Sequence, residues 1–119
     1  MTSGSRFVFL DAFPSGTFDA ALVVFIPGWI ATRNELFHIL DLRLNLPDYF
    51  GWNWDALEEC LRDLSWIEVP HEIVLFHQGL PFPKGSDERS IYLAILKDAV
   101  ATWGNDQRHT LTVVFPNGV

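Results

Sequence analysis

Runs of β-forming residues, separated by long segments with helical periodicity, constrain the fold of this chain most strongly. One run is Leu22–Ile26, an uninterrupted apolar stretch that ends at Pro27, and others follow at Ile73–Phe76 and Thr110–Phe115. Continuous apolar strands are typical of parallel sheets whose strands are buried on both faces. Strands separated by helices need crossover connections. We therefore predict an α/β fold with a small parallel sheet.

The N-terminal residues are a candidate for an additional strand, at residues 7–13, with Pro14-Ser15-Gly16 as the following turn. The whole chain has 119 residues, a length typical of one domain. We expect a single domain over residues 1–119, in which residues 1–20 are an extension and residues 21–119 are the core.

Two of the expected helices carry clear signals at both ends. The first begins after Thr32, which forms a capping-box pattern with Glu35, and ends before Pro47. The other is capped by Ser86 or Asp87 and ends at Gly104. Each helix has one apolar side, made by Leu36, Phe37, Leu40 and Leu44 in the first and by Tyr92, Ile95, Leu96, Ala99 and Trp103 in the other.

Between them, Asn53 is a good N-cap for a helix that runs to Leu64. At 100° per residue this helix separates into an apolar and an acidic side. The apolar side holds Leu57, Cys60, Leu61 and Leu64, and the acidic side holds Asp55, Glu58, Glu59 and Asp63. Because Asp55, Glu59 and Asp63 are four residues apart, their carboxylates are neighbours on the helix surface. Like charges at this spacing destabilise a helix by roughly 0.2–0.5 kcal/mol per pair.

The chain carries a formal net charge of −7 and has a pI of about 4.8. Residues 48–72 contain seven acidic residues against Arg62 alone and so hold most of that charge. A protein that binds phosphates needs a basic face, so nucleic acid is not expected as the direct ligand. Two interpretations remain: a solvated acidic face that keeps the protein soluble, or a surface for a cationic partner.

Large aromatic side chains favour the second interpretation. Tyr49, Phe50, Trp52 and Trp54 crowd the loop that enters the acidic helix, and Trp66 follows that helix. Tryptophan and tyrosine are common anchors of protein interfaces, although we expect Trp54 to belong to the core. The loop and the acidic helix therefore predict a protein-binding surface.

Other classes of function find little support in the sequence. The chain has no HExxH segment, nucleophile elbow or P-loop, so we expect a protein that is not an enzyme and needs no metal or cofactor. We interpret its histidines, His38, His71, His77 and His109, as ordinary surface or strand-end residues. Cys60 is expected in the core. The chain has no signal-peptide pattern and no apolar run long enough to span a membrane, which predicts a cytoplasmic protein.

Two segments resemble the signature of the barstar family. Residues 46–61 (LPDYFGWNWDALEECL) match its loop of proline, acid, two aromatics and glycine, which leads through asparagine into an Asp-Ala-Leu helix start. Residues 66–70 (WIEVP) are similar to the Trp-x-Glu-x-Pro segment that follows. The order of elements also agrees from about Ala21 to Phe115. The resemblance implies the barstar fold, a three-stranded parallel sheet with helices, and a cis bond between Val69 and Pro70.

Barstar-like proteins inhibit barnase-type ribonucleases by inserting this loop and helix into the active site. The resemblance implies an interface with Trp66 as an aromatic contact and Asp98 as a peripheral carboxylate. Its other implied members are Tyr49, Gly51, Asn53, Asp55 and Glu59, and the aromatic and acidic patterns add Trp52, Glu58 and Asp63. Three positions depart from the family pattern: Glu59 stands where aspartate is common, Phe50 lacks a tyrosine hydroxyl, and Trp52 replaces an acid of the type member.

The expected function is therefore inhibition of a basic ribonuclease or toxin nuclease by a monomer that occludes its active site. The expected partner is a protein, with no direct contact to nucleic acid or membrane. The alternative is a barstar-like binding module for a different basic protein, without ribonuclease inhibition, which would use the same surface.

Overall fold

The structure is a computed structural model that describes residues 6–10, 21–68, 71–104 and 108–117. Its strands and helices alternate along most of the chain. They are β1 (Arg6–Leu10), β2 (Leu22–Ile26), α1 (Arg33–Leu44), α2 (Trp54–Asp63), β3 (Glu72–His77), α3 (Asp87–Trp103) and β4 (Thr110–Pro116). The turn expected at residues 14–16 and the Val69–Pro70 bond lie outside the described residues.

The four strands form one parallel sheet in the order β1-β4-β3-β2. β4 pairs with β1 through Val114 and Val8, and β3 pairs with β2 through Leu75 and Val24. The predicted α/β class is confirmed, and so is the additional N-terminal strand, which occupies Arg6–Leu10 and joins the sheet beside β4.

The expectation that Leu22–Ile26 is buried on both faces is wrong, because β2 lies at an edge of the sheet. Val24 and Ile26 are buried against the helices, whereas Val23 and Phe25 on the opposite face are only partly buried. The strands that are buried on both faces are the central ones, β3 and β4. An apolar run thus identified the strand but not its place in the sheet.

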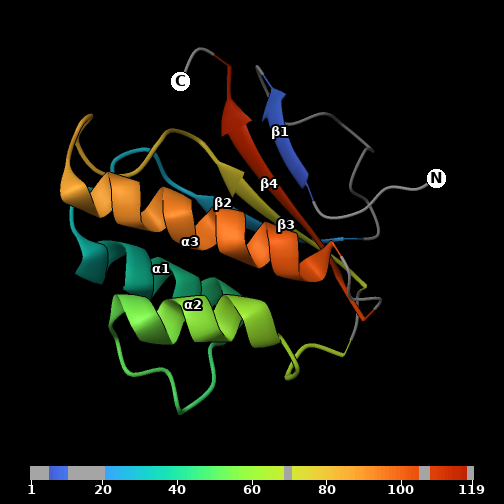
Figure 1. The fold of residues 1–119 in the computed structure, drawn as a ribbon. Helices are drawn as coiled ribbons and strands as arrows, with labels where there is room; N and C mark the ends of the chain where they lie inside the picture. The colour runs from blue at the N-terminus through green and yellow to red at the C-terminus, as the bar shows by residue number, and fades with distance from the viewer. Residues whose placement is uncertain (1–5, 11–20, 69–70, 105–107, 118–119) are drawn as a thin grey trace.

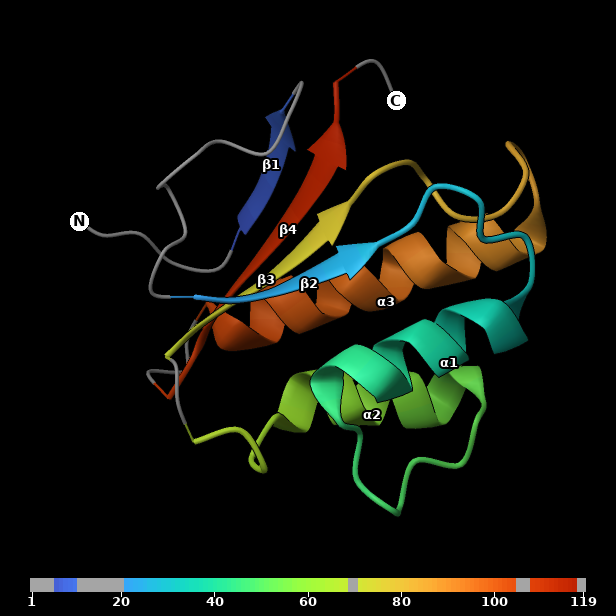
Figure 2. The same cartoon turned by 180° about the vertical axis from the view of Figure 1, so that it is seen from behind.

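All three helices lie on the same side of the sheet, with α1 and α3 packed on the strands and α2 packed against α3 (Figures 1 and 2). They bury the apolar sides predicted from the sequence, including every residue expected on the apolar sides of α1 and α3. Cys60 and Leu57 of α2 are also buried in this core. α2 and α3 are tied together where the Trp103 indole N–H donates to the Leu61 carbonyl oxygen, 2.7 Å away. The acidic helix is therefore held rigidly against the rest of the molecule.

The helix starts agree with the sequence analysis. Thr32 and Glu35 form a complete capping box, and Asn53 and Ser86 each accept a hydrogen bond from the first turn of their helix. Gly104 is the C-cap of α3, as expected. Gly104 is right-handed, at φ −61°, and the left-handed caps are Asn45 and Leu64.

The histidines divide into two groups, and two of them are not surface residues. His38 and His71 are exposed. His77 ends β3, as expected, yet it is only 1% exposed and bonds the Val114 carbonyl and the Tyr92 hydroxyl. His109 is also buried, and its ring nitrogens lie near the carbonyl oxygens of His71 and Ile67. Both buried rings join segments that are distant in sequence.

Candidate functional site

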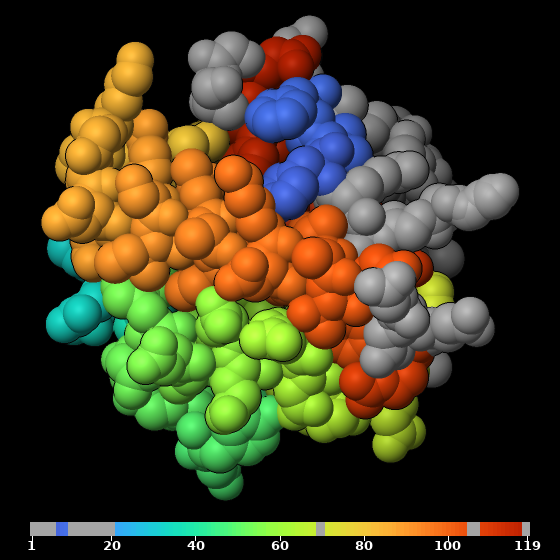
Figure 3. All heavy atoms as spheres, viewed as in Figure 1, coloured from blue at the N-terminus to red at the C-terminus, as the bar shows by residue number. Residues whose placement is uncertain are grey.

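The acidic side of α2 forms one wall of an open groove of about 520 Å³, and the end of α3 forms the other wall. The two helices lie side by side on one face of the molecule, α2 in green and α3 in orange (Figure 3). The groove is lined by Asp55, Glu58, Glu59, Arg62, Asp63, Thr102 and Arg108. All four carboxylates predicted on this side of the helix therefore meet in one concave surface.

The groove carboxylates differ in whether they contact other side chains of the protein. Glu58 lies 3.6 Å from Arg62, whose guanidinium also donates to the Thr102 hydroxyl at 3.1 Å. Within the part of the chain that the structure describes, Asp55 and Glu59 have neither an ion pair nor a side-chain hydrogen bond, and both are exposed. Unpaired carboxylates on a rigid helix are available to bind external cations.

Asp63, the last carboxylate of the stripe, is held by the loop that precedes α2. It accepts hydrogen bonds from the Tyr49 hydroxyl and from the Ser65 hydroxyl. Partial burial and the nearby Asp63 carboxylate raise the pKa of Tyr49 above its usual range. The Tyr49 hydroxyl therefore stays protonated and fixes the loop to the far end of the helix.

Cys60 lies on the opposite side of α2 and is fully buried. Burial, together with the charges of Asp63 and Glu59, raises the pKa of its thiol to about 11. Because only the thiolate is a good nucleophile, this cysteine is a packing residue rather than a reactive one.

The loop before α2 is held by hydrogen bonds at both ends. The Phe50 backbone N–H donates to the Pro47 carbonyl at 2.9 Å. The Asn53 side chain accepts from the Ala56 N–H at 2.8 Å and donates to the Gly51 carbonyl at 3.3 Å. Asn53 therefore both starts the helix and positions the residues ahead of it, so its role in the described structure is local organisation.

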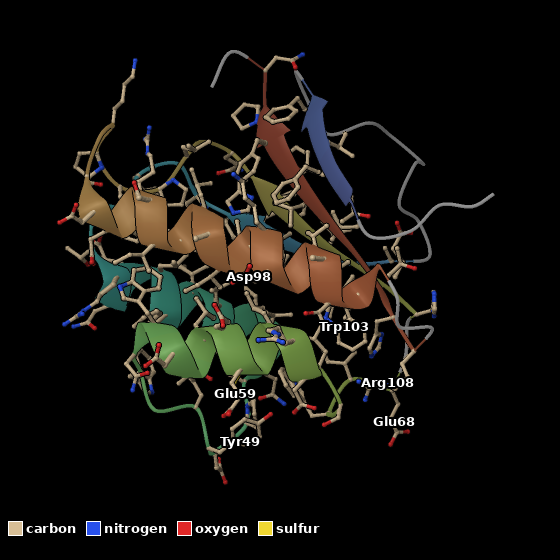
Figure 4. The ribbon with its side chains drawn as sticks, viewed as in Figure 1. Tyr49, Glu59, Glu68, Asp98, Trp103 and Arg108 are labelled. Atoms are coloured by element: carbon tan, nitrogen blue, oxygen red, sulfur yellow. The ribbon has the colours of Figure 1, made fainter. Side chains whose placement is uncertain are left out.

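The remaining expected site residues lie outside the groove. Trp66 is half-buried and donates to the Leu44 carbonyl at 3.0 Å. Asp98 is exposed on α3, on the same face as Glu59 (Figure 4), but it does not line the groove. Gly51 and Trp52 are exposed in the loop. As expected, Trp54 packs against the core, where its indole N–H donates to Glu88 at 3.3 Å.

Sequence reasoning did not find two residues of the groove, Thr102 and Arg108. They follow α2 by about forty residues and join it only because α3 packs alongside. Arg108 lies over the Trp103 ring, with its guanidinium carbon 5.0 Å from the ring centroid. No local pattern in the sequence signals either residue, since both depend on how two helices pack.

The described residues contain neither a metal-binding cluster nor a membrane-spanning helix. No group of three or more histidine, cysteine, aspartate or glutamate side chains lies close enough to hold a metal ion there. Within the same residues, no helix has the length and apolar character that crossing a membrane requires.

Comparison with known protein families gives one match. The family model described as Barstar (barnase inhibitor) matches residues 22–116, which include β2 and all elements after it. The matched region begins after β1, so the N-terminal strand lies outside it. No curated protein matches the chain.

Proposed function

Because the chain belongs to the barstar family of barnase inhibitors, we propose that it blocks the active site of a basic ribonuclease or toxin nuclease. The acidic side of α2 and the loop before it are the inhibitory surface. The chain works by binding and catalyses no reaction of its own. A folded, cytoplasmic monomer is the form that meets the nuclease.

The mechanism is occlusion by carboxylates that take the place of RNA phosphates. A ribonuclease must present cationic side chains to hold its substrate, so its site attracts any surface that offers anions in a fixed array. Carboxylates bound to arginine or lysine form short, charge-assisted hydrogen bonds, as phosphates do. A helix supplies such an array at one-turn intervals of about 5.4 Å.

The single observation that carries this proposal is that Asp55 and Glu59 lie exposed and unpaired, within the described residues, on a helix that is otherwise well anchored. α2 is fixed by the Asn53 cap, by the Tyr49–Asp63 contact and by the Trp103–Leu61 hydrogen bond. A rigid surface loses little conformational entropy when it binds, so most of its electrostatic attraction contributes to affinity. The same residues repel one another in the free protein.

The test is titration of the purified protein into a barnase-type ribonuclease while RNA cleavage is followed, at low and at moderate salt. We expect stoichiometric inhibition that weakens as salt rises, because screening reduces attraction between opposite charges. Inhibition that requires a large excess of protein would contradict a specific complex.

The second candidate function, a binding module for another basic protein, predicts a different result in this titration. Such a module leaves the ribonuclease fully active at micromolar concentrations of the chain. Its acidic surface would still retain a basic partner in a pull-down, and Glu59→Gln would reduce that retention. The titration therefore separates the two candidates.

A further inference from the structure

Trp52 is an exposed tryptophan in a backbone conformation that large side chains rarely adopt. It lies between Gly51 and Asn53 in the loop before α2, and 44% of its surface is exposed. Its φ is 57°, in the left-handed region. Glycine and asparagine reach this region easily, whereas a bulky side chain is an outlier there. Trp52 therefore occupies a position whose backbone conformation favours glycine, which has no side chain.

The side chain is nevertheless held in a defined orientation. The Trp52 ring lies 6.2 Å from the Phe37 ring, at 76°, and 5.6 Å from the Phe50 ring, at 40°. Phe37 and Phe50 are both buried. One side of the indole is therefore supported by the core, and the rest of it faces solvent beside the start of the acidic helix.

Three of the other four tryptophans have a structural role in this fold. The indole N–H groups of Trp54, Trp66 and Trp103 each donate to an oxygen atom of the protein. Among the residues that the structure describes, no group accepts a hydrogen bond from the Trp52 indole. Trp52 thus differs from the structural tryptophans in exposure, in backbone conformation and in its unused donor.

We infer that Trp52 is a specificity-determining anchor whose indole face takes a cationic side chain, an arginine or lysine at the rim of the partner's basic site. This inference rests on the proposed function. Tryptophan is the best aromatic acceptor of such cations, and the neighbouring carboxylates make the surroundings favourable for positive charge. Tryptophan is also among the residue types most enriched at the positions that dominate interface energetics. The strained loop is then retained because it directs the indole toward the partner.

The experiment compares Trp52→Gly and Trp52→Phe with Trp29→Gly, the matched control. Trp29 is also an exposed tryptophan, at 62%, but it precedes α1 and lies outside the loop that enters the acidic helix. Binding to a barnase-type ribonuclease is measured by stopped flow, with circular dichroism confirming that every variant is folded. We expect Trp52→Gly to lower affinity about tenfold or more, Trp52→Phe to recover part of the loss, and Trp29→Gly to change affinity less than twofold.

The rates distinguish an anchor from a structural residue. Loss of an uncharged contact should increase the dissociation rate and leave the salt dependence of association unchanged, since the protein's charge is the same. A similar loss of affinity in Trp29→Gly, or equal affinities of Trp52→Gly and the wild type, would overturn the inference.

If the wild-type chain does not bind the ribonuclease, the proposed function fails, and an oligo-arginine peptide then decides the inference. Binding of this peptide is followed by calorimetry. Weaker binding by Trp52→Gly than by Trp29→Gly supports a cation-binding indole. Equal binding by the two variants overturns it.

Discussion

At the scale of single residues, acidic side chains of the same helix have different roles. Glu58 and Asp63 are engaged by Arg62 and Tyr49, so they help to hold α2 and its loop in place. Asp55 and Glu59 make no such contacts within the described residues. The residues that contribute least to the fold are therefore the best candidates for binding.

We expect Glu59→Gln and Asp55→Asn each to weaken ribonuclease binding by about tenfold or more, equivalent to ~1.4 kcal/mol. The amides keep the shape of the side chains and remove only the charge, so a buried cation of the partner loses its counter-charge. Calorimetry or inhibition assays measure the change. The matched control is Asp41→Asn on α1, outside the groove, which should change affinity less than twofold. Similar losses in all three variants would disprove the assignment of the surface.

His77 is the residue that should make stability depend on pH. Its Nδ1 lies 3.0 Å from the Val114 carbonyl and its Nε2 lies 2.7 Å from the Tyr92 hydroxyl. A carbonyl only accepts and a hydroxyl can donate, so a neutral ring with its proton on Nδ1 satisfies both partners. Desolvation lowers the pKa of His77 from 6.5 to about 4.

Between these two pKa values the unfolded chain binds the proton and the folded protein does not. Stability should therefore fall as the pH drops from about 6.5 to about 4, by ~3 kcal/mol from this residue, and the contribution of His77 should be constant above that range. Urea denaturation as a function of pH measures the effect. His77→Gln should have a flatter profile, and parallel profiles for the two proteins would refute the role of His77.

At the scale of elements, α2 combines an unfavourable charge pattern with strong local anchoring. Three carboxylates repeat every four residues along it, and its N-terminus is stabilised by the Asn53 side chain. Its C-terminus closes at Leu64, which is left-handed and fully buried and donates to the Cys60 carbonyl at 3.0 Å. The ends of the helix therefore offset the repulsion along its surface.

We predict that Asn53→Ala lowers the free energy of unfolding by about 1 kcal/mol, because the Ala56 N–H loses its acceptor. It should also weaken ribonuclease binding, since the same side chain positions Gly51 and the loop. Thr32→Ala is the matched control, because it removes the cap of α1 at a similar cost in stability. Urea denaturation and inhibition assays together test this. Equal effects of the two variants on binding would mean that Asn53 acts through stability alone.

At the scale of the whole molecule, charge is concentrated rather than spread. The chain carries −7, and residues 48–72, which include α2, hold most of it. A concentrated field of this kind orients an approaching basic partner before contact. In the complex that we propose, this charge should therefore affect how fast the partner associates as well as how tightly it binds.

We expect the association rate constant with a basic ribonuclease to fall steeply between low and moderate salt, while the dissociation rate constant changes little. Exposed charges interact over roughly 10 Å at 0.1 M salt, and short contacts within the complex are screened less. Stopped-flow measurements at several salt concentrations provide both constants. Glu59→Gln should reduce the slope for association. A slope that is the same in Glu59→Gln and the wild type would contradict steering by this face.

The features that the sequence predicts well depend on neighbours within a few residues. The caps at Thr32, Asn53 and Ser86 and the apolar sides of the helices follow from local hydrogen bonding and from the helical period, and the structure confirms them. The acidic side of α2 could be predicted from the sequence for the same reason. The β1 strand was predicted as a candidate because short apolar runs favour strands.

The features that only the tertiary structure decided depend on contacts between distant segments. The place of β2 at the edge of the sheet is set by strand order, which apolar runs do not encode. The groove needs Thr102 and Arg108 from beyond α2, and the burial of His77 and His109 needs partners on other elements. Helical periodicity determines which side of a helix is apolar. The packing of the helices on the sheet and on one another determines which residues that apolar side contacts, and which residues lie next to the acidic side of α2.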